Sequence, residues 1–404
     1  MGRAGIGVNA AKSGPDYIDA AFLAAASGAS AVNLDSHAMR RDLIRHLAAD
    51  GPEPRLLVEG VMGLFDGTDG GSGSTVSVAE ALQAPVMLVL DARHQGQTAA
   101  ALAAGIATQL PDGVSLAGVV LNRIASPRHE ELISAALAER GIALFGSLPA
   151  NGDIEIPSRH LGLVQAADLA ASGALEPMID KAAELVAAHL DLGAIEAAFT
   201  GIAAPETGPA LLPPPGHRIA IARDAAFGFS YEHLMAGWRD AGAEIMKFSP
   251  LADEAPPPDA DFIFLPGGYP ELHLPELSRA GNFLGGLRAA AERGTRIYGE
   301  CGGYMVLGET IIDAEGTSYP MAGLLALETS FAKRKLHLGY RRMAPLAQAW
   351  PGLEPVTGHE FHYTSATRAE GDPLFAVSDA AGRDLGTMGL VRGSVAGSYA
   401  HIIA

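Results

Sequence analysis

The single cysteine of this 404-residue chain lies in a glycine-rich segment, 298–304, which reads YGECGGY. A short strand is expected over 296–298 and a helix from Tyr304 onward, so Cys301 lies between them. A nucleophile on a tight strand-to-helix turn needs neighbours without a Cβ, because the backbone passes close to other segments there. The start of a helix also favours thiolate over thiol. A free cysteine is more often a small buried apolar residue, but the flanking glycines favour a catalytic role for Cys301.

Two other segments could complete a site around this cysteine. A strand expected over 261–265 is followed by PGGYPE (266–271), where paired glycine amides could stabilise a developing oxyanion. Taken alone, an ordinary Pro-Gly turn explains that segment better. The chain closes with GSYAHIIA (397–404), and His401 could take the thiol proton although it is distant in sequence.

Together with GHEFHY (358–363), these segments resemble the glutamine amidotransferase domain of the cobyrinic acid a,c-diamide synthase family, which is similar to class I glutaminases. Many class I glutaminases have a glutamate two residues after the histidine, where this chain has Ile403. The cobyrinate branch is similar in lacking that glutamate, so what orients the imidazole stays open. His359 and His362 are interpreted as packing or orienting groups, since they do not form a helical zinc motif. The resemblance implies Cys301 as nucleophile, His401 as its base, and Gly267, Gly268 and Gly302 on the oxyanion and glutamine side.

The rest of the chain predicts an α/β fold with two domains. Apolar runs alternate with amphipathic segments, which is typical of βαβ units around a buried parallel sheet. A proline-rich stretch over 200–216 then indicates an extended linker, and the alternation restarts after it. We expect an amidoligase domain over 1–195, a linker over 196–217 and an amidotransferase domain over 218–404. The expected strands are 55–59, 85–91, 116–122 and 218–223, and the expected helices are 75–83, 98–110, 129–140 and 231–241.

Acidic residues follow two of the expected first-half strands. The segment KSGPDYID (12–19) follows a strand expected over 6–10, and VEGVMGLFDG (58–67) carries acids at the end of the next strand. Carboxylates at the ends of adjacent parallel strands suit Mg²⁺ held together with substrate phosphates. Solvated loop acids explain the same residues equally well.

Both acidic segments also resemble the cobyrinate synthase family, whose first domain is similar to dethiobiotin synthetase. The resemblance implies a carbon–nitrogen ligase that amidates the a and c side-chain carboxylates of cobyrinic or hydrogenobyrinic acid with ATP and L-glutamine. It leaves the metal content of that corrinoid open. The implied residues are Glu59 and Asp16 at Mg²⁺, Lys12, Tyr17, Asp19 and Asp66 at phosphate or substrate carboxylate, and Asn122 beside the nucleotide base.

The phosphate loop that this chemistry calls for does not occur in the sequence. No Gly-x-x-x-x-Gly-Lys-Ser/Thr segment is found in the 404 residues, and residues 2–6 resemble the tail of the helix that follows such a loop. A misplaced start codon would explain the missing loop. We therefore expect these residues to bind Mg-ATP weakly and to form no amide, and we expect both activities to return when the chain is extended upstream of Met1. The alternatives are a chain with only glutaminase or binding activity, or an amidase for another tetrapyrrole such as nickel sirohydrochlorin.

Composition indicates which classes of partner and which compartment to expect. A net charge of −18 argues against nucleic acid and anionic membranes, although a local pocket can still bind an anionic substrate. One cysteine cannot form an internal disulfide, and no apolar run reaches the ~18 residues of a membrane span. We expect a cytoplasmic protein with small-molecule partners, and a homodimer is one option for its assembly.

Overall fold

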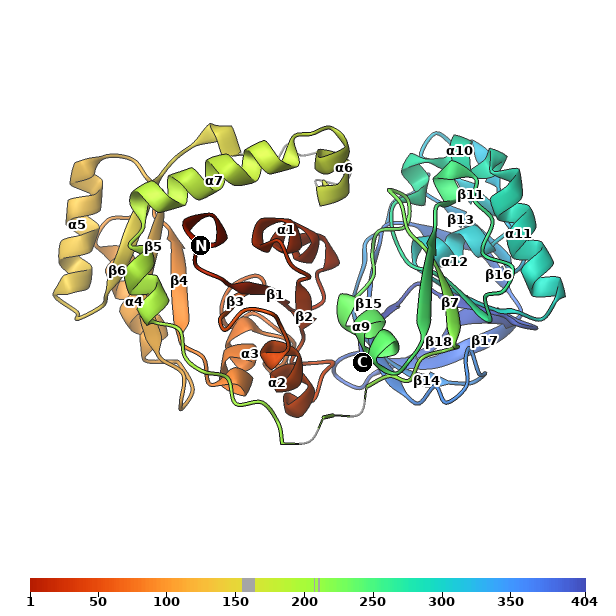
Figure 1. Ribbon diagram of the computed structural model, residues 1–404, viewed down its shortest axis with the longest axis horizontal. Coiled ribbons are helices and arrows are strands. Elements are labelled where there is room, and N and C mark those ends of the chain that lie inside the picture. The colour runs from red at the N-terminus through yellow and green to blue at the C-terminus, as the bar shows by residue number, and fades with distance from the viewer. Residues whose placement is uncertain (155–163, 207, 210) are drawn as a thin grey trace. The chain divides into compact units, whose positions relative to one another are not determined.

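The computed structural model describes residues 1–154, 164–206, 208–209 and 211–404 (Figure 1). The described chain divides into two compact units, of which unit 1 comprises Met1–Gly67 and Gly71–Pro209, and unit 2 comprises Thr68–Gly70 and Ala210–Ala404. Both units have α/β architecture, as expected from the alternation of apolar runs and amphipathic segments. Among the described residues, no helix is long and apolar enough to cross a membrane.

Unit 1 is built from two three-stranded parallel sheets with strand orders β2-β1-β3 and β4-β5-β6. The strands are β1 (Asn9–Ser13), β2 (Val32–Leu34), β3 (Leu56–Glu59), β4 (Val86–Asp91), β5 (Leu116–Ile124) and β6 (Leu144–Pro149). The helices are α1 (Tyr17–Ser27), α2 (Arg41–Ala49), α3 (Thr75–Leu82), α4 (Thr98–Ala107), α5 (Pro127–Ala138), α6 (Ala166–Ala171), α7 (Leu175–His189) and α8 (Leu192–Ala197).

The first strand differs from the sequence expectation. It was expected over 6–10, but β1 begins at Asn9 and contains Lys12. The reason is its register, which pairs Asn9 with Leu56 at the start of β3 and Lys12 with Glu59 at its end. Lys12 is therefore a buried strand residue and does not lie in the loop after the strand.

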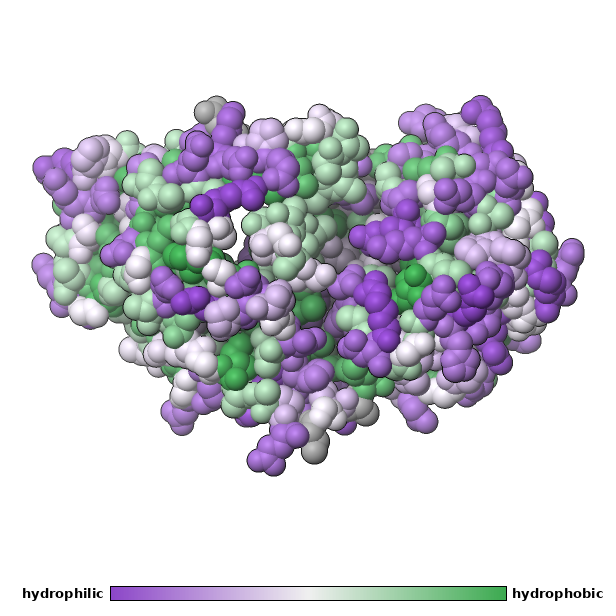
Figure 2. Space-filling model, viewed as in Figure 1, coloured by the Kyte–Doolittle hydropathy of each residue, from purple (hydrophilic) through white to green (hydrophobic). Residues whose placement is uncertain are grey.

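An apolar cavity of about 810 Å³ lies between β3 and β4 in unit 1. Leu57 of β3 and Val89 of β4 line it and are 39% and 55% exposed. Within the described residues, β3 and β4 are each the last strand of their sheet on this side. Apolar side chains, green in Figure 2, gather on the surface of unit 1 over β4 and β5. Parallel sheets are normally covered on both faces, so this cavity, called the groove below, is an exposed apolar surface beside two sheet edges.

Unit 2 is centred on a ten-stranded sheet with the order β20-β15-β14-β17-β18-β19-β10-β9-β7-β8. A second sheet has the order β12-β11-β13-β16. The strands are β7 (Arg218–Ala222), β8 (Glu244–Phe248), β9 (Phe262–Leu265), β10 (Arg296–Glu300), β11 (Thr310–Ile312), β12 (Ser318–Pro320), β13 (Ala326–Ser330), β14 (His337–Pro345), β15 (Val356–His362), β16 (Ser365–Glu370), β17 (Asp372–Ser378), β18 (Asp384–Arg392), β19 (Val395–Ser398) and β20 (His401–Ile402). The helices are α9 (Glu232–Asp240), α10 (Leu274–Arg279), α11 (Gly281–Glu292) and α12 (Gly302–Leu307).

Parallel pairing in the middle of the large sheet brings the candidate catalytic segments to one edge. β10 runs parallel to both β9 and β19, with Gly299 paired to Leu265 and Glu300 paired to Ser398. All four residues of β9 are buried, as its continuous apolar sequence predicts for a central strand. The carboxyl ends of these three strands therefore lie side by side, and the residues after them can converge.

The groove of unit 1 should bind a hydrophobic dye such as anilinonaphthalene sulfonate. Val89→Lys puts a charge into the groove, so we expect it to lower dye fluorescence. Leu346→Lys is the matched control, because Leu346 is 54% exposed but lies outside the groove. Each change should alter the free energy of unfolding by less than about 0.5 kcal/mol, since both side chains face solvent. Equal fluorescence from both variants would show that the dye binds elsewhere.

Candidate active site

Cys301 occupies the turn between β10 and α12 and has an unusual backbone conformation. Its φ and ψ are 47° and −108°, a region that residues with a Cβ rarely adopt. The Cys301 N–H donates to the carbonyl oxygen of Ser398 at 2.9 Å, which fixes the turn to the end of β19. Strain held in place by surrounding structure is typical of functional sites. The turn is the strand-to-helix arrangement expected from the sequence.

Gly267 lies where the side chains of Cys301 and His401 meet. A Cβ at Gly267 would overlap Cε1 of His401, and would lie 2.8 Å from its Nε2 and 3.1 Å from Cβ of Cys301. The cysteine and the histidine therefore contact the same small space, with the Nε2 side of the ring toward Gly267. His401 is completely buried at the start of β20. The structure brings together the thiol and the base predicted from widely separated segments.

Gly268 and Gly302 lie together beside Cys301. A Cβ at Gly302 would be 3.2 Å from the backbone N of Gly268 and 2.7 Å from Cδ of Pro270. A Cβ at Gly268 would overlap the carbonyl oxygen of Ala226, so this position also requires glycine. The backbones of Gly268 and Gly302 therefore lie close together next to the nucleophile, and their role as oxyanion donors stays a prediction.

The resting site holds a neutral thiol and a neutral imidazole. Burial, reinforced by the charge of Glu271, raises the pKa of Cys301, and a hydrogen bond with the Gly302 backbone only partly opposes this. Burial also lowers the pKa of His401 to about 3, and the nearby His359 and His362 add to the effect. The expectation of a thiolate at the helix start is therefore wrong for the resting protein. With only six residues, α12 offers a weak dipole, and desolvation of the thiolate outweighs it.

In unit 1, Lys12 joins two of the predicted acidic residues. Its Nζ donates to Oδ2 of Asp19 at 2.6 Å and to the carbonyl oxygen of Gly60 at 3.1 Å, and lies 3.4 Å from Oε1 of Glu59. The Lys12 side chain is 4% exposed, whereas both acids are partly exposed. A buried ammonium of this kind needs paired acids, because desolvation disfavours its charge. The ends of β1 and β3 thus form one charged cluster.

Asp16 and Tyr17 stand next to this cluster at the start of α1. Oδ1 of Asp16 caps the helix by accepting the backbone N–H groups of Ile18 and Asp19 at 2.8 and 3.0 Å. Burial, followed by repulsion from Asp19, raises the pKa of Asp16, and burial likewise raises the pKa of Glu59. Tyr17 is buried as the first residue of α1. Asp16 is therefore close enough to Lys12, Asp19 and Glu59 to influence them electrostatically.

Two predicted residues lie apart from the Lys12 cluster. Asp66 closes a turn by accepting the Gly63 N–H at 2.9 Å, and it lines the apolar groove together with Glu59. Asn122 lies near the end of β5, paired with Asp91 of β4. Sequence reasoning missed Asn33, whose buried amide donates to the carbonyl oxygens of Gly14 and Asp16 and so holds the loop.

Comparison with known proteins gives one family match in each of the two units. Residues 218–404 match the family model of a CobB/CobQ-like glutamine amidotransferase domain, and residues 12–158 match that of an AAA domain. The chain is 50% identical to the hydrogenobyrinate a,c-diamide synthase of Brucella anthropi over 410 residues, which covers 99% of this chain and 92% of that protein. The synthases of Rhizobium meliloti and Rhodobacter capsulatus are 50% and 48% identical, covering 99% and 100% of this chain and 93% of each relative.

The chain belongs to the hydrogenobyrinate a,c-diamide synthase family. The resemblance found in the sequence motifs is therefore confirmed, and so is the α/β fold class with a nucleotide-binding-type first domain and an amidotransferase second domain. The domain bounds expected over 1–195, 196–217 and 218–404 stay a prediction, as do the roles of the individual site residues.

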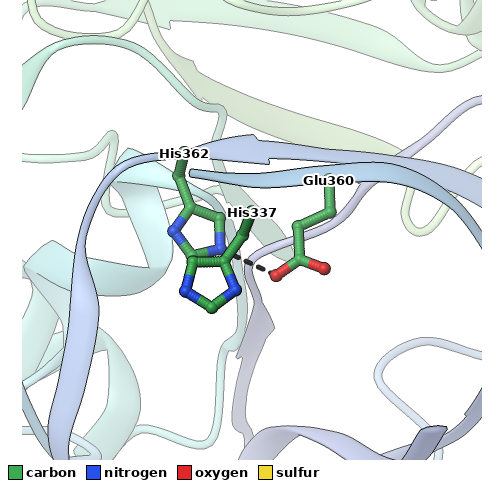
Figure 3. Close-up of side chains that lie close together, drawn as sticks. All are labelled: His337, Glu360 and His362. Atoms are coloured by element: carbon green, nitrogen blue, oxygen red, sulfur yellow. Dashed lines mark hydrogen bonds and ion pairs between the residues drawn. The ribbon is translucent and has the colours of Figure 1, made fainter. Parts of the chain in front are cut away.

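This family member also carries an ionic network around His362, in which sequence reasoning missed His337, Arg341 and Glu360. Figure 3 shows His337, Glu360 and His362 of this network. Arg341 of β14 binds Oε2 of Glu360 through Nε at 2.7 Å and Nη2 at 2.6 Å. His362 contacts Oε1 of Glu360 through Nε2 at 2.7 Å and the carbonyl oxygen of Thr364 through Nδ1 at 3.0 Å. A carbonyl can only accept, so Nδ1 donates. Although burial alone would raise it, bonds from His362 and Arg341 lower the pKa of Glu360. In the sequence, the alternating polar residues of GHEFHY (358–363) were the signal that could have indicated this network.

The geometry of this network fits a cluster of ion pairs better than a metal site. His337, Glu360 and His362 offer ligand atoms within 4.8 Å of one another, the one such group in the described part of the chain. The His337 and His362 rings stack in parallel at 4.7 Å, so they do not converge on a common point between them. Because Arg341 already holds Glu360, a cation there would face a guanidinium. His362 also stacks on Tyr399 at 3.9 Å, which connects the network to the segment before His401.

Gly267→Ala should disable glutamine hydrolysis, because a methyl group cannot fit between Cys301 and His401. A displacement of about 1 Å costs about 100-fold in rate, and we expect a loss of at least that size in kcat. Gly285→Ala is the control, because a Cβ there meets nothing within 4 Å inside α11. That variant should retain wild-type hydrolysis and gain about 0.5–1 kcal/mol of stability. Full activity in Gly267→Ala would show that the side chains of Cys301 and His401 do not both adjoin Gly267.

The pH dependence of alkylation by iodoacetamide should report the protonation of Cys301, since the chain has one cysteine, whereas the size of the native rate also reflects the burial of the sulfur. A raised pKa means less thiolate at pH 7, so we expect alkylation of the native protein to be about tenfold or more slower than in the same chain unfolded in urea. The native rate should still rise with pH beyond pH 9. A plateau below pH 7 would instead indicate a thiolate–imidazolium pair in the resting enzyme.

Proposed function

We propose that this protein converts the a and c side-chain carboxylates of cobyrinic or hydrogenobyrinic acid to amides, using L-glutamine as the nitrogen donor and ATP as the activating cosubstrate. Three relatives that share about half of its residues over nearly the whole chain are named hydrogenobyrinate a,c-diamide synthases. In chemical class the enzyme is a carbon–nitrogen ligase that acts in the cytoplasm.

The observation that carries this proposal is the convergence of Cys301, His401 and Gly267. When glutamine binds, Nε2 of His401 takes the thiol proton as sulfur attacks the side-chain amide carbon. The amides of Gly268 and Gly302 stabilise the oxyanion that forms. The imidazolium returns its proton to the leaving nitrogen, which departs as ammonia and leaves a thioester. Water, deprotonated by His401, then releases glutamate and restores the thiol.

Unit 1 supplies the groups for the second half-reaction. A corrinoid carboxylate attacks the γ-phosphate of ATP to give an acyl phosphate and ADP, and ammonia then displaces phosphate to give the amide. The buried Lys12 contributes positive charge toward phosphate or substrate carboxylate, and Asp19 orients its ammonium. Tyr17 and Asp66 add substrate contacts, and Asn122 binds the nucleotide base.

The acids of unit 1 fit a divalent metal ion. Asp16 and Glu59 offer hard oxygen ligands, and their pKa values are raised chiefly by burial, with a further contribution from their neighbouring acids. A divalent cation would relieve that repulsion, so we assign Glu59 and Asp16 as the residues that hold Mg²⁺. Bound there, Mg²⁺ would neutralise charge on the ATP phosphates.

Cys301→Ala should separate the two half-reactions. We expect glutamine-dependent amidation to fall about 10³-fold or more, because no nucleophile remains to release ammonia. Amidation from added ammonium salt should stay close to wild type. The assay follows a,c-diamide formation by mass spectrometry, with the 404-residue chain and a version extended by upstream in-frame codons compared in parallel. Equal loss with both nitrogen sources would contradict the division of labour.

In the version extended by upstream codons, Glu59→Gln should impair amidation from glutamine and from ammonia alike. The substitution keeps the size of the side chain but removes the charge that holds Mg²⁺, so we expect a loss of about 100-fold or more with both donors. Glu80→Gln, on the exposed surface of α3, is the control and should leave both rates unchanged. Glutamine hydrolysis should continue in both variants. Wild-type amidation by Glu59→Gln would make this acid a solvated loop residue.

A further inference from the structure

The residue directly before the nucleophile lies against the catalytic histidine. Oε2 of Glu300 is 3.7 Å from Nδ1 of His401, and both side chains are buried, with exposed fractions of 5% and 0%. The Cε1–Nε2 edge of the imidazole faces Gly267, and a Cβ at Gly267 would also lie close to Cβ of Cys301. The ring therefore has the carboxyl group beside Nδ1 and keeps Nε2 on the side of Gly267 and the nucleophile. That is the order of groups in a nucleophile–histidine–acid triad.

The Glu300 carboxyl group is held in this orientation by the backbone. Its Oε1 accepts the N–H of Ile402 at 3.0 Å, so the acid is tied to the strand that carries His401. Glu300 itself is the last residue of β10, and Cys301 follows it directly. The same short segment therefore supplies both the nucleophile and the acid. A separation of 3.7 Å becomes a hydrogen bond after a small rotation of the ring, and such contacts commonly tighten when substrate binds.

The usual place for an acid in this fold is occupied by an apolar residue. Ile403, two positions after His401, is fully buried and its N–H donates to the carbonyl oxygen of Thr357 at 2.9 Å. It cannot orient an imidazole. Besides burial, the groups that lower the pKa of His401 are His359 and His362, which both lie on β15 and carry no negative charge. The Glu300 carboxylate lies 3.7 Å from Nδ1 of this ring, which makes Glu300 a candidate for the missing acid.

We propose that Glu300 is the positioning acid of the glutaminase site, which holds His401 with its proton on Nδ1 and its Nε2 lone pair toward the thiol of Cys301. This inference rests on the proposed glutaminase roles of Cys301 and His401. The role is positional, because Glu300 acts through the imidazole. As His401 takes the thiol proton on Nε2, the carboxylate balances the positive charge that forms on the ring.

Burial adds a pH signature to this arrangement. It raises the pKa of Glu300 to about 8, and the bond from the Ile402 amide opposes this only in part. Below that pH the carboxyl group carries a proton and can donate to Nδ1, which leaves the ring proton on Nε2, where it blocks the base. Glutamine hydrolysis should therefore rise with pH across this range. Glu271 and Glu360 act on the Cys301 thiol itself and remain in place in the variants below.

Glu300→Gln is the informative substitution. The amide oxygen can still accept the Ile402 N–H, while the amide nitrogen donates to Nδ1 and forces the wrong ring tautomer. We expect kcat for glutamine hydrolysis to fall about 100-fold or more, with KM for glutamine and the melting temperature nearly unchanged. The rise of kcat/KM with pH that belongs to Glu300 should disappear. Glu300→Asp, which keeps the charge, should recover part of the rate.

The controls distinguish this inference from the function on which it rests. Glu292→Gln, on the exposed face of α11, should retain the wild-type rate and pH profile. If Cys301→Ala abolishes hydrolysis but Glu300→Gln has the wild-type kcat and pH profile, the positioning role is wrong and the proposed function stands. A loss of kcat accompanied by an equal rise in KM and a large drop in melting temperature would also overturn it, since Glu300 would then be structural. Hydrolysis by Cys301→Ala would instead refute the glutaminase assignment itself.

Discussion

The close approach of backbone at Gly267 to the side chains of Cys301 and His401 is the contact on which the active site of unit 2 depends. It is possible only because neighbouring positions also lack side chains. A Cβ at Gly303 would overlap the carbonyl oxygen of Leu265, and one at Gly397 would lie 2.7 Å from that of Gly299. These glycines let α12 pack onto the ends of β9, β10 and β19. The nucleophile and base are therefore positioned by strands of a central sheet, and such elements hold geometry better than loops do.

Burial determines the chemistry of this site as much as proximity does. A thiol and an imidazole that are both removed from water are most stable in their neutral forms, so charge appears only when substrate is in place. Of the carboxylates nearby, Glu360 is held between Arg341 and His362. The charge of Glu271 acts on the thiol and adds to the effect of burial on its pKa.

Unit 1 uses burial in the opposite sense, to concentrate charge. Lys12 is fixed inside β1, and the parallel register with β3 brings Glu59 alongside it. The cost of removing an ammonium from water is offset by Asp19 and Glu59 together. Asp16 uses one carboxylate oxygen to cap α1, which fixes the direction in which its other oxygen can bind a ligand. The strand ends of this sheet therefore carry a preformed cluster of one cation and several acids.

The sequence by itself determined the buried strands with continuous apolar runs, such as Phe262–Leu265, because such runs have no stable place outside a buried sheet. It also determined the elbow at Cys301, because glycines flank the residue on both sides, and the motifs sufficed to recognise the family. Only the tertiary structure placed Lys12 within β1, paired His401 with Glu300, and reversed the expected ionisation of the thiol. Each of these depends on register, burial or a distance between segments far apart in the chain. Local composition and spacing do not encode such quantities, so they emerge only when the sheet has assembled.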